Sequence, residues 1–325
     1  MGEHILGARI WLVVLAACAI AAIPFLAAGF SLDAGFLPGS IEAPAAGGLA
    51  GRLLMRYRQT YRLGGAIEGS LLMSFVGLFG VMAAYSAAAA GFPLADAALL
   101  NLDQAIGYDW IRYAKFCADH HYLRSLLYFA YFSMFLQPIA IISLLTFTGN
   151  QVRSEKFILA NLTSLSLTVT MFLFLPATTA WTFANQEQLA ARLLSSLPLS
   201  GNSWMTDLLS LRSGGGRHLT MAAGIIAFPS FHCVSALLSV WAAWPVRRLR
   251  VPLCLLNLLM IASAPIFGGH YATDLIGGAV VAAITIALIN PLHRRLVAAK
   301  MVRILPPLEP LLLRWMPPHG DTSRC

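Results

Sequence analysis

Two histidines and one aspartate stand at the ends of long apolar segments: His232, His270 and Asp274. Ionisable groups within apolar spans are costly to bury and are functional candidates by default. His270 and Asp274 are four residues apart, so on a helix they lie on the same face. A carboxylate there can accept the imidazole Nδ1–H, which leaves Nε2 with a free lone pair as a nucleophile or a base.

The segment that leads to His232 has the residues of a helix start that could bind an anion. Pro229 ends the incoming loop, and Ser230 can cap the helix that follows. Free backbone N–H groups at such a start suit phosphate oxygens. The combination predicts phosphoryl transfer through a phosphohistidine. His270 would attack phosphorus, and His232 would protonate the leaving oxygen and later deprotonate the acceptor.

The elements that must position these residues are membrane helices. Of the 325 residues, 58% are hydrophobic and 11% are charged, and the mean hydropathy is +0.72. A soluble domain has about 25% charged residues, so a soluble enzyme, a disordered protein and a coiled coil are excluded. A spanning helix needs about 20 mainly apolar residues. Seven segments qualify, at about 5–28, 71–90, 123–147, 157–181, 230–244, 251–267 and 271–292, and the short fifth and sixth should extend into their flanks.

We therefore predict an all-α fold, a polytopic membrane helical bundle with a six-helix core plus an additional N-terminal transmembrane helix. The first span is interpreted as an uncleaved helix rather than a signal peptide, because its apolar run is long and its end is a poor cleavage site. From His232 the chain runs about 15 residues to a basic turn and returns over about 19 to His270. At 1.5 Å per residue each leg crosses most of the hydrocarbon core, so both histidines should reach the same face.

The basic residues predict the orientation of the bundle. Most of them fall on one side, which we expect to be cytoplasmic: Arg52, Arg56, Arg58, Arg62, Arg153, Lys156, Arg247, Arg248, Arg250, Arg294, Arg295, Lys300, Arg303, Arg314 and Arg324. The loops at about 91–122 and 182–229 would face outward, where six acids, Asp96 and Asp103 among them, offset the basic residues. Residues 1–63 would hold the first helix and a basic surface segment, 64–292 the catalytic membrane domain, and 293–325 a basic cytoplasmic tail.

The charge and the cysteines point to no further partner or cofactor. The net charge of +8 lies in short runs between apolar segments, so no nucleic-acid partner is predicted. The five cysteines are scattered and form no CxxC pair. Because no cluster of acids or cysteines could hold an ion, no metal and no other cofactor is expected.

Two short motifs resemble those of the PAP2 (type 2 phosphatidic acid phosphatase) superfamily. Pro229-Ser230-Phe231-His232 looks like its PSxH motif, and the stretch from Gly269 to Asp274 looks like its last motif, which ends in HxxxD. The chain from about 95 to 292 most resembles the inositolphosphotransferase branch, which includes fungal inositol phosphorylceramide synthase and bacterial relatives. The resemblance implies a PAP2-like core with a catalytic triad at His232, His270 and Asp274, and a bacterial inner-membrane protein. The distribution of basic residues predicts that its site faces outward.

The departures from the phosphatase pattern favour transfer over hydrolysis. Ala264 stands where phosphatases have an arginine, and their first motif, KxxxxxxRP, is missing. Other groups must therefore neutralise the phosphate. The predicted substrate-binding residues are Ser230, Gln137, Tyr131, Ser133, Arg217 and Tyr271. Alternatively, Ser133 and Gln137 only join neighbouring helices, and Arg217 is a solvated loop charge.

The predicted partners are a phospholipid or polyprenyl phosphate donor and an alcohol or water acceptor. Three other classes of protein remain open at the level of the sequence. The histidines could be axial haem ligands, the fold could serve as a non-catalytic lipid-binding scaffold, or the polar groups could relay protons in a transporter.

Overall fold

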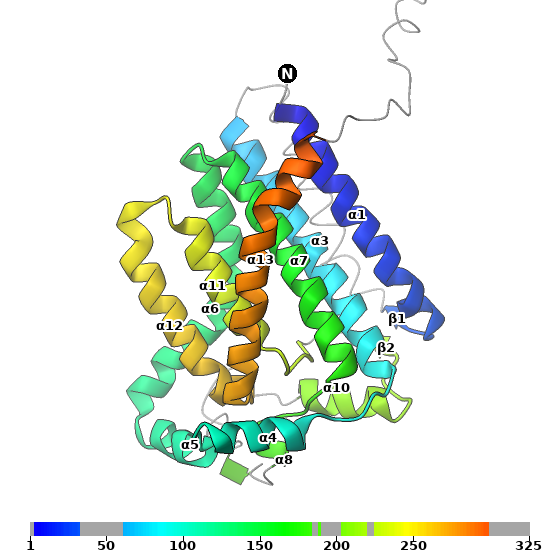
Figure 1. Cartoon of the computed structure of the whole chain (residues 1–325), viewed down its shortest axis with the longest axis vertical. Helices are drawn as coiled ribbons and strands as arrows, with labels where there is room; N and C mark the ends of the chain where they lie inside the picture. The colour runs from blue at the N-terminus through cyan, green and yellow to red at the C-terminus, as the bar shows by residue number, and fades with distance from the viewer. Residues whose placement is uncertain (1–2, 33–60, 184–187, 190–202, 220–223, 299–325) are drawn as a thin grey trace, which may run out of the picture.

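The computed structural model describes residues 3–32, 61–183, 188–189, 203–219 and 224–298. Within that part, six helices are long and apolar enough to cross a membrane, and a seventh apolar helix is shorter. The six are α1 (Glu3–Ala27), α3 (Tyr61–Ala89), α6 (His121–Phe147), α7 (Gln151–Phe174), α12 (Arg250–Phe267) and α13 (Ala272–Ala298). The seventh, α11 (Phe231–Ala243), precedes the short 3-10 helix η2 (Arg247–Leu249). These helices run side by side, with α1 at one edge of the bundle (Figure 1).

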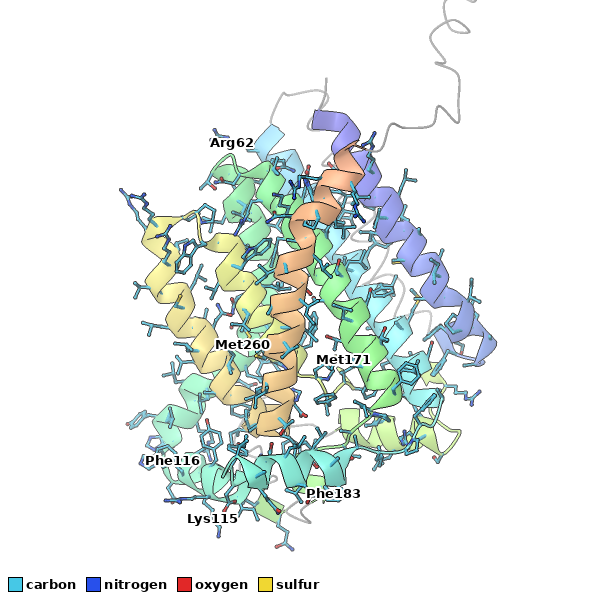
Figure 2. All side chains as sticks on the ribbon, viewed as in Figure 1. Arg62, Lys115, Phe116, Met171, Phe183 and Met260 are labelled. Carbon is cyan, nitrogen blue, oxygen red and sulfur yellow. The ribbon has the colours of Figure 1, made fainter. Side chains whose placement is uncertain are left out.

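One end of the bundle is crossed by short helices that lie across its long axis (Figure 1). They are α4 (Asp96–Ala105), α5 (Trp110–Asp119), α8 (Ala180–Phe183) and α10 (Ser203–Arg212). The strands β1 (Ser31–Leu32) and β2 (His218–Leu219) form a parallel pair next to α10. We call this the loop end, marked in Figure 2 by Lys115 and Phe183, and the opposite end, marked by Arg62, the basic end.

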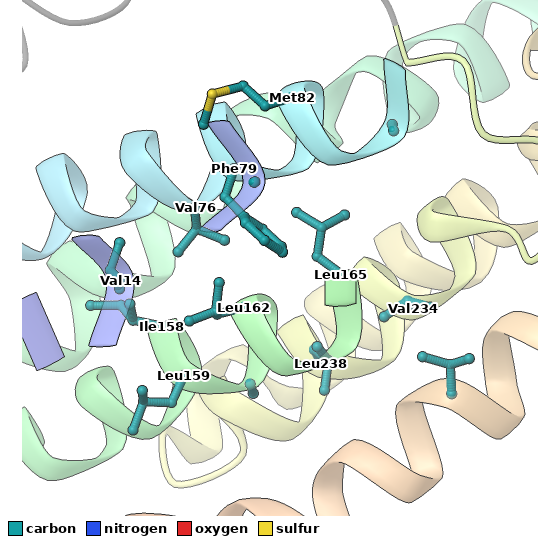
Figure 3. Packing of buried hydrophobic residues seen from close by; sticks show 14 of the residues in the cluster. Val14, Val76, Phe79, Met82, Ile158, Leu159, Leu162, Leu165, Val234 and Leu238 are labelled. Carbon is teal, nitrogen blue, oxygen red and sulfur yellow. The ribbon is translucent and has the colours of Figure 1, made fainter. Parts of the chain in front are cut away.

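A large part of the core lies around α7, against which both α3 and α11 pack. Phe79 of α3, Leu165 of α7 and Leu238 of α11 belong to this buried cluster (Figure 3). On the outside of the bundle large apolar side chains are exposed, such as Ile23 and Val251 at 69% each. Hydrocarbon tails solvate such side chains as well as a protein core does, whereas water does not. The exposed apolar surface therefore fits an integral, multi-pass membrane protein.

The predicted fold is confirmed. The additional helix α1 is followed by six core helices, which are α3, α6, α7, α11, α12 and α13. The helix ends differ from the prediction. α3 and α7 begin ten and six residues earlier than expected, because their polar first turns read as loop in the sequence. α7 ends at Phe174, two residues before Pro176, so the expected span to 181 is too long. The parts of the predicted basic segment at 52–60 and of the tail at 299–325 lie outside the described residues.

The expected extension of the fifth span into its flanks is wrong. α11 has 13 residues and is bracketed by Pro229 and Pro245, which lack the N–H that a continuing helix would need. Ser230 caps its first turn by accepting a hydrogen bond from the backbone N–H of Cys233. The sixth span, by contrast, gains three residues from η2.

Candidate active site

His270 and Asp274 form a buried pair at the start of α13. Nδ1 of His270 lies 3.1 Å from Oδ2 of Asp274, and the same oxygen accepts the backbone N–H of Tyr271 at 2.9 Å. His270 is 2% exposed and Asp274 is fully buried. Since an ionised carboxylate can only accept, Nδ1 is the donor in this contact, and in a neutral imidazole that arrangement leaves the lone pair on Nε2.

His232 lies beside this pair, although it comes from another helix. Its ring centroid is 5.8 Å from that of His270, in an edge-on arrangement. Tyr131 of α6 stacks on the ring of His232, with centroids 4.0 Å apart and an angle of 20° between the planes. Nε2 of His232 is buried and has no hydrogen-bond partner among the described residues. The ring of His232 is thus packed against Tyr131, and its Nε2 keeps its hydrogen-bonding capacity unused within the described part of the chain.

A glycine corner between α12 and α13 sets the direction of the His270 ring. Gly269 has a φ of +65°, and a Cβ there would meet Cβ of Thr179 at 2.6 Å. At Gly268 a Cβ would lie 2.9 Å from Nε2 of His270. Only glycine therefore fits this turn, and the absence of a side chain at 268 lets the His270 ring pack directly against the backbone of the corner.

The start of α11 packs tightly on α13 and presents open amides. The backbone N–H of Ser230 donates to the carbonyl of Asp274 at 3.0 Å, and a Cβ at Gly278 would meet the carbonyl oxygen of Ser230 at 2.4 Å. Within the described residues, the N–H groups of Phe231 and His232 make no hydrogen bond. First-turn amides of this kind attract anions.

Two buried carboxylates of α4 complete the surroundings of the pair, and the sequence analysis missed them. Asp103 accepts the backbone N–H groups of Ala272 and Thr273 at 2.9 and 2.8 Å. Asp96 accepts the hydroxyl of Tyr271 at 2.9 Å. They are 2% and 1% exposed, whereas the sequence analysis treated them as outer-loop charges. Their spacing of seven residues, which puts both on one face of a helix, was the available signal.

The other predicted substrate-binding residues are engaged in hydrogen bonds at different places in the bundle. The amide of Gln137 donates to Oγ of Ser133 at 2.8 Å and accepts from Asn257 of α12 at 3.0 Å, so this network joins two helices. The guanidinium of Arg217 donates to the carbonyl of Ala28 and is exposed. The hydroxyl of Tyr271 is engaged by Asp96. Of the predicted set, Tyr131, Ser230 and Tyr271 contact the catalytic candidates, and Tyr271 does so through its backbone N–H.

Arg124 is a further residue that the sequence analysis did not single out. It lies on α6, four residues before Tyr128 and seven before Tyr131, and so shares their face of the helix. Tyr128 packs edge-on against Phe267, three residues before His270. Nε of Arg124 is buried and has no hydrogen-bond partner among the described residues. Arg124 thus shares the face of α6 that carries Tyr128 and Tyr131, and its Nε is a donor without a partner in the described part of the chain.

Fold and site together define a multi-pass helical membrane protein with a buried His–Asp pair and a second histidine at one end of its bundle. The family profile of the PAP2 superfamily matches residues 97–288, which is more than half of the chain. The chain belongs to the PAP2 superfamily, whose members are phosphatases and phosphotransferases. The match runs from α4 into α13 and leaves out α1 and α3. No curated protein and no solved structure matches the chain.

Proposed function

We propose that the protein transfers a phosphoryl-containing group of a membrane lipid through a phosphohistidine on His270. The observation that carries the proposal is the 3.1 Å contact between His270 Nδ1 and Asp274, with the His232 ring 5.8 Å away. A nucleophile oriented by a carboxylate and a separate acid/base within reach are the two parts that this reaction needs.

The reaction proceeds in two displacements. The Nε2 lone pair of His270 attacks phosphorus, the bond from phosphorus to the lipid oxygen breaks, and His232 gives that oxygen a proton from Nε2. An acceptor oxygen then attacks phosphorus, the P–N bond breaks, and Nε2 of His232 takes the acceptor's proton. Asp274 stabilises the positive charge that develops on His270 and keeps its ring in one tautomer.

Two sets of donors would neutralise the negative charge of the phosphate, the first amides of α11 and the guanidinium of Arg124. The open N–H groups of Phe231 and His232 supply donors at the positive end of α11. Arg124 supplies a guanidinium in place of the arginine that Ala264 replaces in the last motif. Its buried Nε without a partner supports this assignment, because a buried donor left unpaired is costly unless a ligand engages it. Tyr131, stacked on His232, borders the same space.

Transfer to an alcohol is the finer form of the proposal. The Gly269-His270-Tyr271 form of the last motif, the tyrosine-rich stretch of α6 and the loss of both cationic clamps resemble the inositolphosphotransferase branch. The donor would be a phospholipid such as phosphatidylinositol, or a polyprenyl phosphate, and the acceptor a lipid alcohol. The same phosphohistidine hydrolyses the donor when water takes the place of the alcohol.

The proposal is tested with protein reconstituted in phosphatidylcholine vesicles. Donors labelled with radioactive phosphorus, phosphatidic acid and phosphatidylinositol, are each added with and without diacylglycerol or ceramide. We expect an acid-labile, alkali-stable label on the protein, and product formation that vanadate inhibits. His270→Ala should abolish the label and lower turnover by more than about a thousandfold, and Asp274→Asn should lower it severely.

His121→Ala is the matched control, because His121 is an exposed histidine at the same end of the bundle. It should keep full turnover and labelling. A His270→Ala protein that still turns over at the wild-type rate would refute the nucleophile assignment. Product formed only with an alcohol acceptor supports transfer, and equal release of free phosphate without one supports hydrolysis.

A further inference from the structure

We infer that α4 is a clasp that holds the catalytic turn, with Asp103 as its principal positioning residue for the His270–Asp274 pair. The inference rests on the proposed function, and neither the PSxH nor the HxxxD motif contains a residue of α4. Its evidence is a set of hydrogen bonds that two buried carboxylates accept from the three residues between His270 and Asp274.

Asp103 caps α13 from a distant part of the chain. Its Oδ2 accepts the N–H of Ala272 at 2.9 Å, and its Oδ1 accepts the N–H and the hydroxyl of Thr273 at 2.8 and 2.6 Å. Helices usually take an N-cap from their own chain, one residue before the first turn. Here the cap lies 169 positions away in the sequence. A carboxylate at a helix start is favourable for the helix dipole, and this one ties α13 to α4 as well.

Asp96 provides the second arm of the clasp, two turns earlier on the same face of α4. It accepts the hydroxyl of Tyr271 at 2.9 Å. It also accepts both the N–H and the hydroxyl of Thr178, at 3.0 and 2.7 Å, which anchors α4 to the segment before α8. The side chain of Tyr271 and the main chain of the next two residues are therefore all held by α4.

The backbone of these residues decides where Asp274 points. Oδ2 of Asp274 accepts from both the N–H of Tyr271 and Nδ1 of His270, so the carboxylate bridges the two ends of one turn. If Ala272 and Thr273 shift, the bridge is lost and the imidazole can rotate. Misplacement by about 1 Å can lower the rate of an enzyme by about a hundredfold. The clasp thus acts on the reaction through His270 without touching the substrate.

The same hydrogen bonds make the starts of α11 and α13 differ in their capacity to bind an anion. At the start of α13, Asp274 accepts the N–H of Tyr271, and Asp103 accepts the N–H groups of Ala272 and Thr273, so these amides are not open to a second anion. In α11, the N–H groups of Phe231 and His232 are open within the described part of the chain. The open amides of α11, which begin beside the two histidines, are therefore the ones left to bind the phosphate.

The test compares Asp103→Asn, Asp103→Ala and Thr273→Val with wild type. Asn101→Ala is the control, an exposed substitution on the same helix. Reconstituted protein is assayed with dioctanoyl phosphatidic acid and with the phosphatidylinositol and ceramide pair, and vanadate binding is followed by the shift in unfolding temperature. We expect kcat to fall about tenfold to a hundredfold in Asp103→Ala, and less in the other two. KM should change less than about twofold, vanadate should stabilise Asp103→Ala less than wild type, and Asn101→Ala should match wild type.

The outcomes separate the inference from the function on which it rests. A folded Asp103→Ala protein with a lower unfolding temperature but wild-type kcat and vanadate response would show a purely structural cap and overturn the clasp. If Asp103→Ala does not fold, the same comparison is made with Asp103→Asn and Thr273→Val. A wild-type protein that neither turns over nor binds vanadate would instead overturn the proposed function.

Discussion

At the scale of single residues, one oxygen of Asp274 does two things. It orients His270 and it closes the turn through the N–H of Tyr271. Its other oxygen, Oδ1, has no hydrogen-bond partner among the described residues. The geometry therefore depends on one atom, which is why the surrounding supports from α4 and from the glycine corner matter. An amide at 274 would retain the shape of the side chain but could present an N–H to Nδ1 and select the wrong tautomer.

Arg124 gives the prediction that belongs to this scale. Arg124→Gln removes the guanidinium while keeping a side chain of similar length and polarity. Hydrogen bonds to a charged group contribute about 1.5–3 kcal/mol each, so we expect kcat/KM for an anionic lipid donor to fall about tenfold to a hundredfold. Arg124→Lys should recover part of the loss, since the charge returns without the forked donors. The measurement is steady-state turnover in neutral vesicles.

Arg112→Gln is the control for Arg124, because Arg112 is an exposed arginine of α5 at the same end of the bundle. Equal losses in both variants would indicate a general surface charge effect. A wild-type kcat/KM in Arg124→Gln would remove this arginine from the site, and the open amides of α11 would remain as the phosphate donors.

At the scale of elements, the site depends on how closely α11 approaches α13. Gly278 makes this contact possible, since a Cβ there would lie 2.4 Å from the backbone oxygen of Ser230 and 2.9 Å from Cβ of Cys233. Backbone cannot move aside as a flexible side chain can. Gly278→Ala should therefore displace the start of α11, and His232 with it. Overpacking costs about 1–3 kcal/mol of stability, and we expect the unfolding temperature and kcat to fall together.

Gly77→Ala is the matched control for Gly278, because a Cβ at Gly77 of α3 meets nothing within 4 Å. It should leave activity unchanged, and it should stabilise the helix slightly because alanine favours a helix more than glycine does. Both variants are measured by thermal unfolding in detergent and by turnover in vesicles. If Gly278→Ala retains wild-type kcat, the close approach of the two helices is not needed for the position of His232.

The sequence predicted the long-range part of this arrangement better than its local details. Two legs of known length between His232 and His270 predicted that both rings reach one end, and the rings lie 5.8 Å apart. The roles of Asp96 and Asp103 were not predicted, because a buried carboxylate and a solvated loop carboxylate look the same in a sequence. Only the tertiary structure shows that they accept hydrogen bonds from Tyr271 and from the first N–H groups of α13. The starts of α3 and α7 were predicted too late, because a polar first turn can be helical and polarity alone does not end a helix.

At the scale of the whole molecule, the arginines of the basic end have structural partners. Arg9 donates to the carbonyl of Leu296 near the end of α13, and Arg153 donates to the carbonyls of Trp241 and Ala242 at the end of α11. Arg250 donates to the carbonyl of Trp244. Cations at helix C-terminal ends are favourable for the helix dipole. Arg153 and Arg250, two of the basic residues that predict the orientation of the bundle, thus also satisfy carbonyl groups at the end of a helix.

The orientation itself gives the prediction at this scale. Lys115 and Arg62 are exposed and lie at opposite ends of the bundle (Figure 2). If basic residues are retained on the cytoplasmic side, the loop end with His232 and His270 faces outward. In a background whose native cysteines are replaced, Lys115→Cys should react with a membrane-impermeant maleimide in intact cells. Arg62→Cys should react only after permeabilisation or in inverted vesicles. The reverse pattern would place the site on the cytoplasmic side and require that its lipid donor be drawn from the inner leaflet.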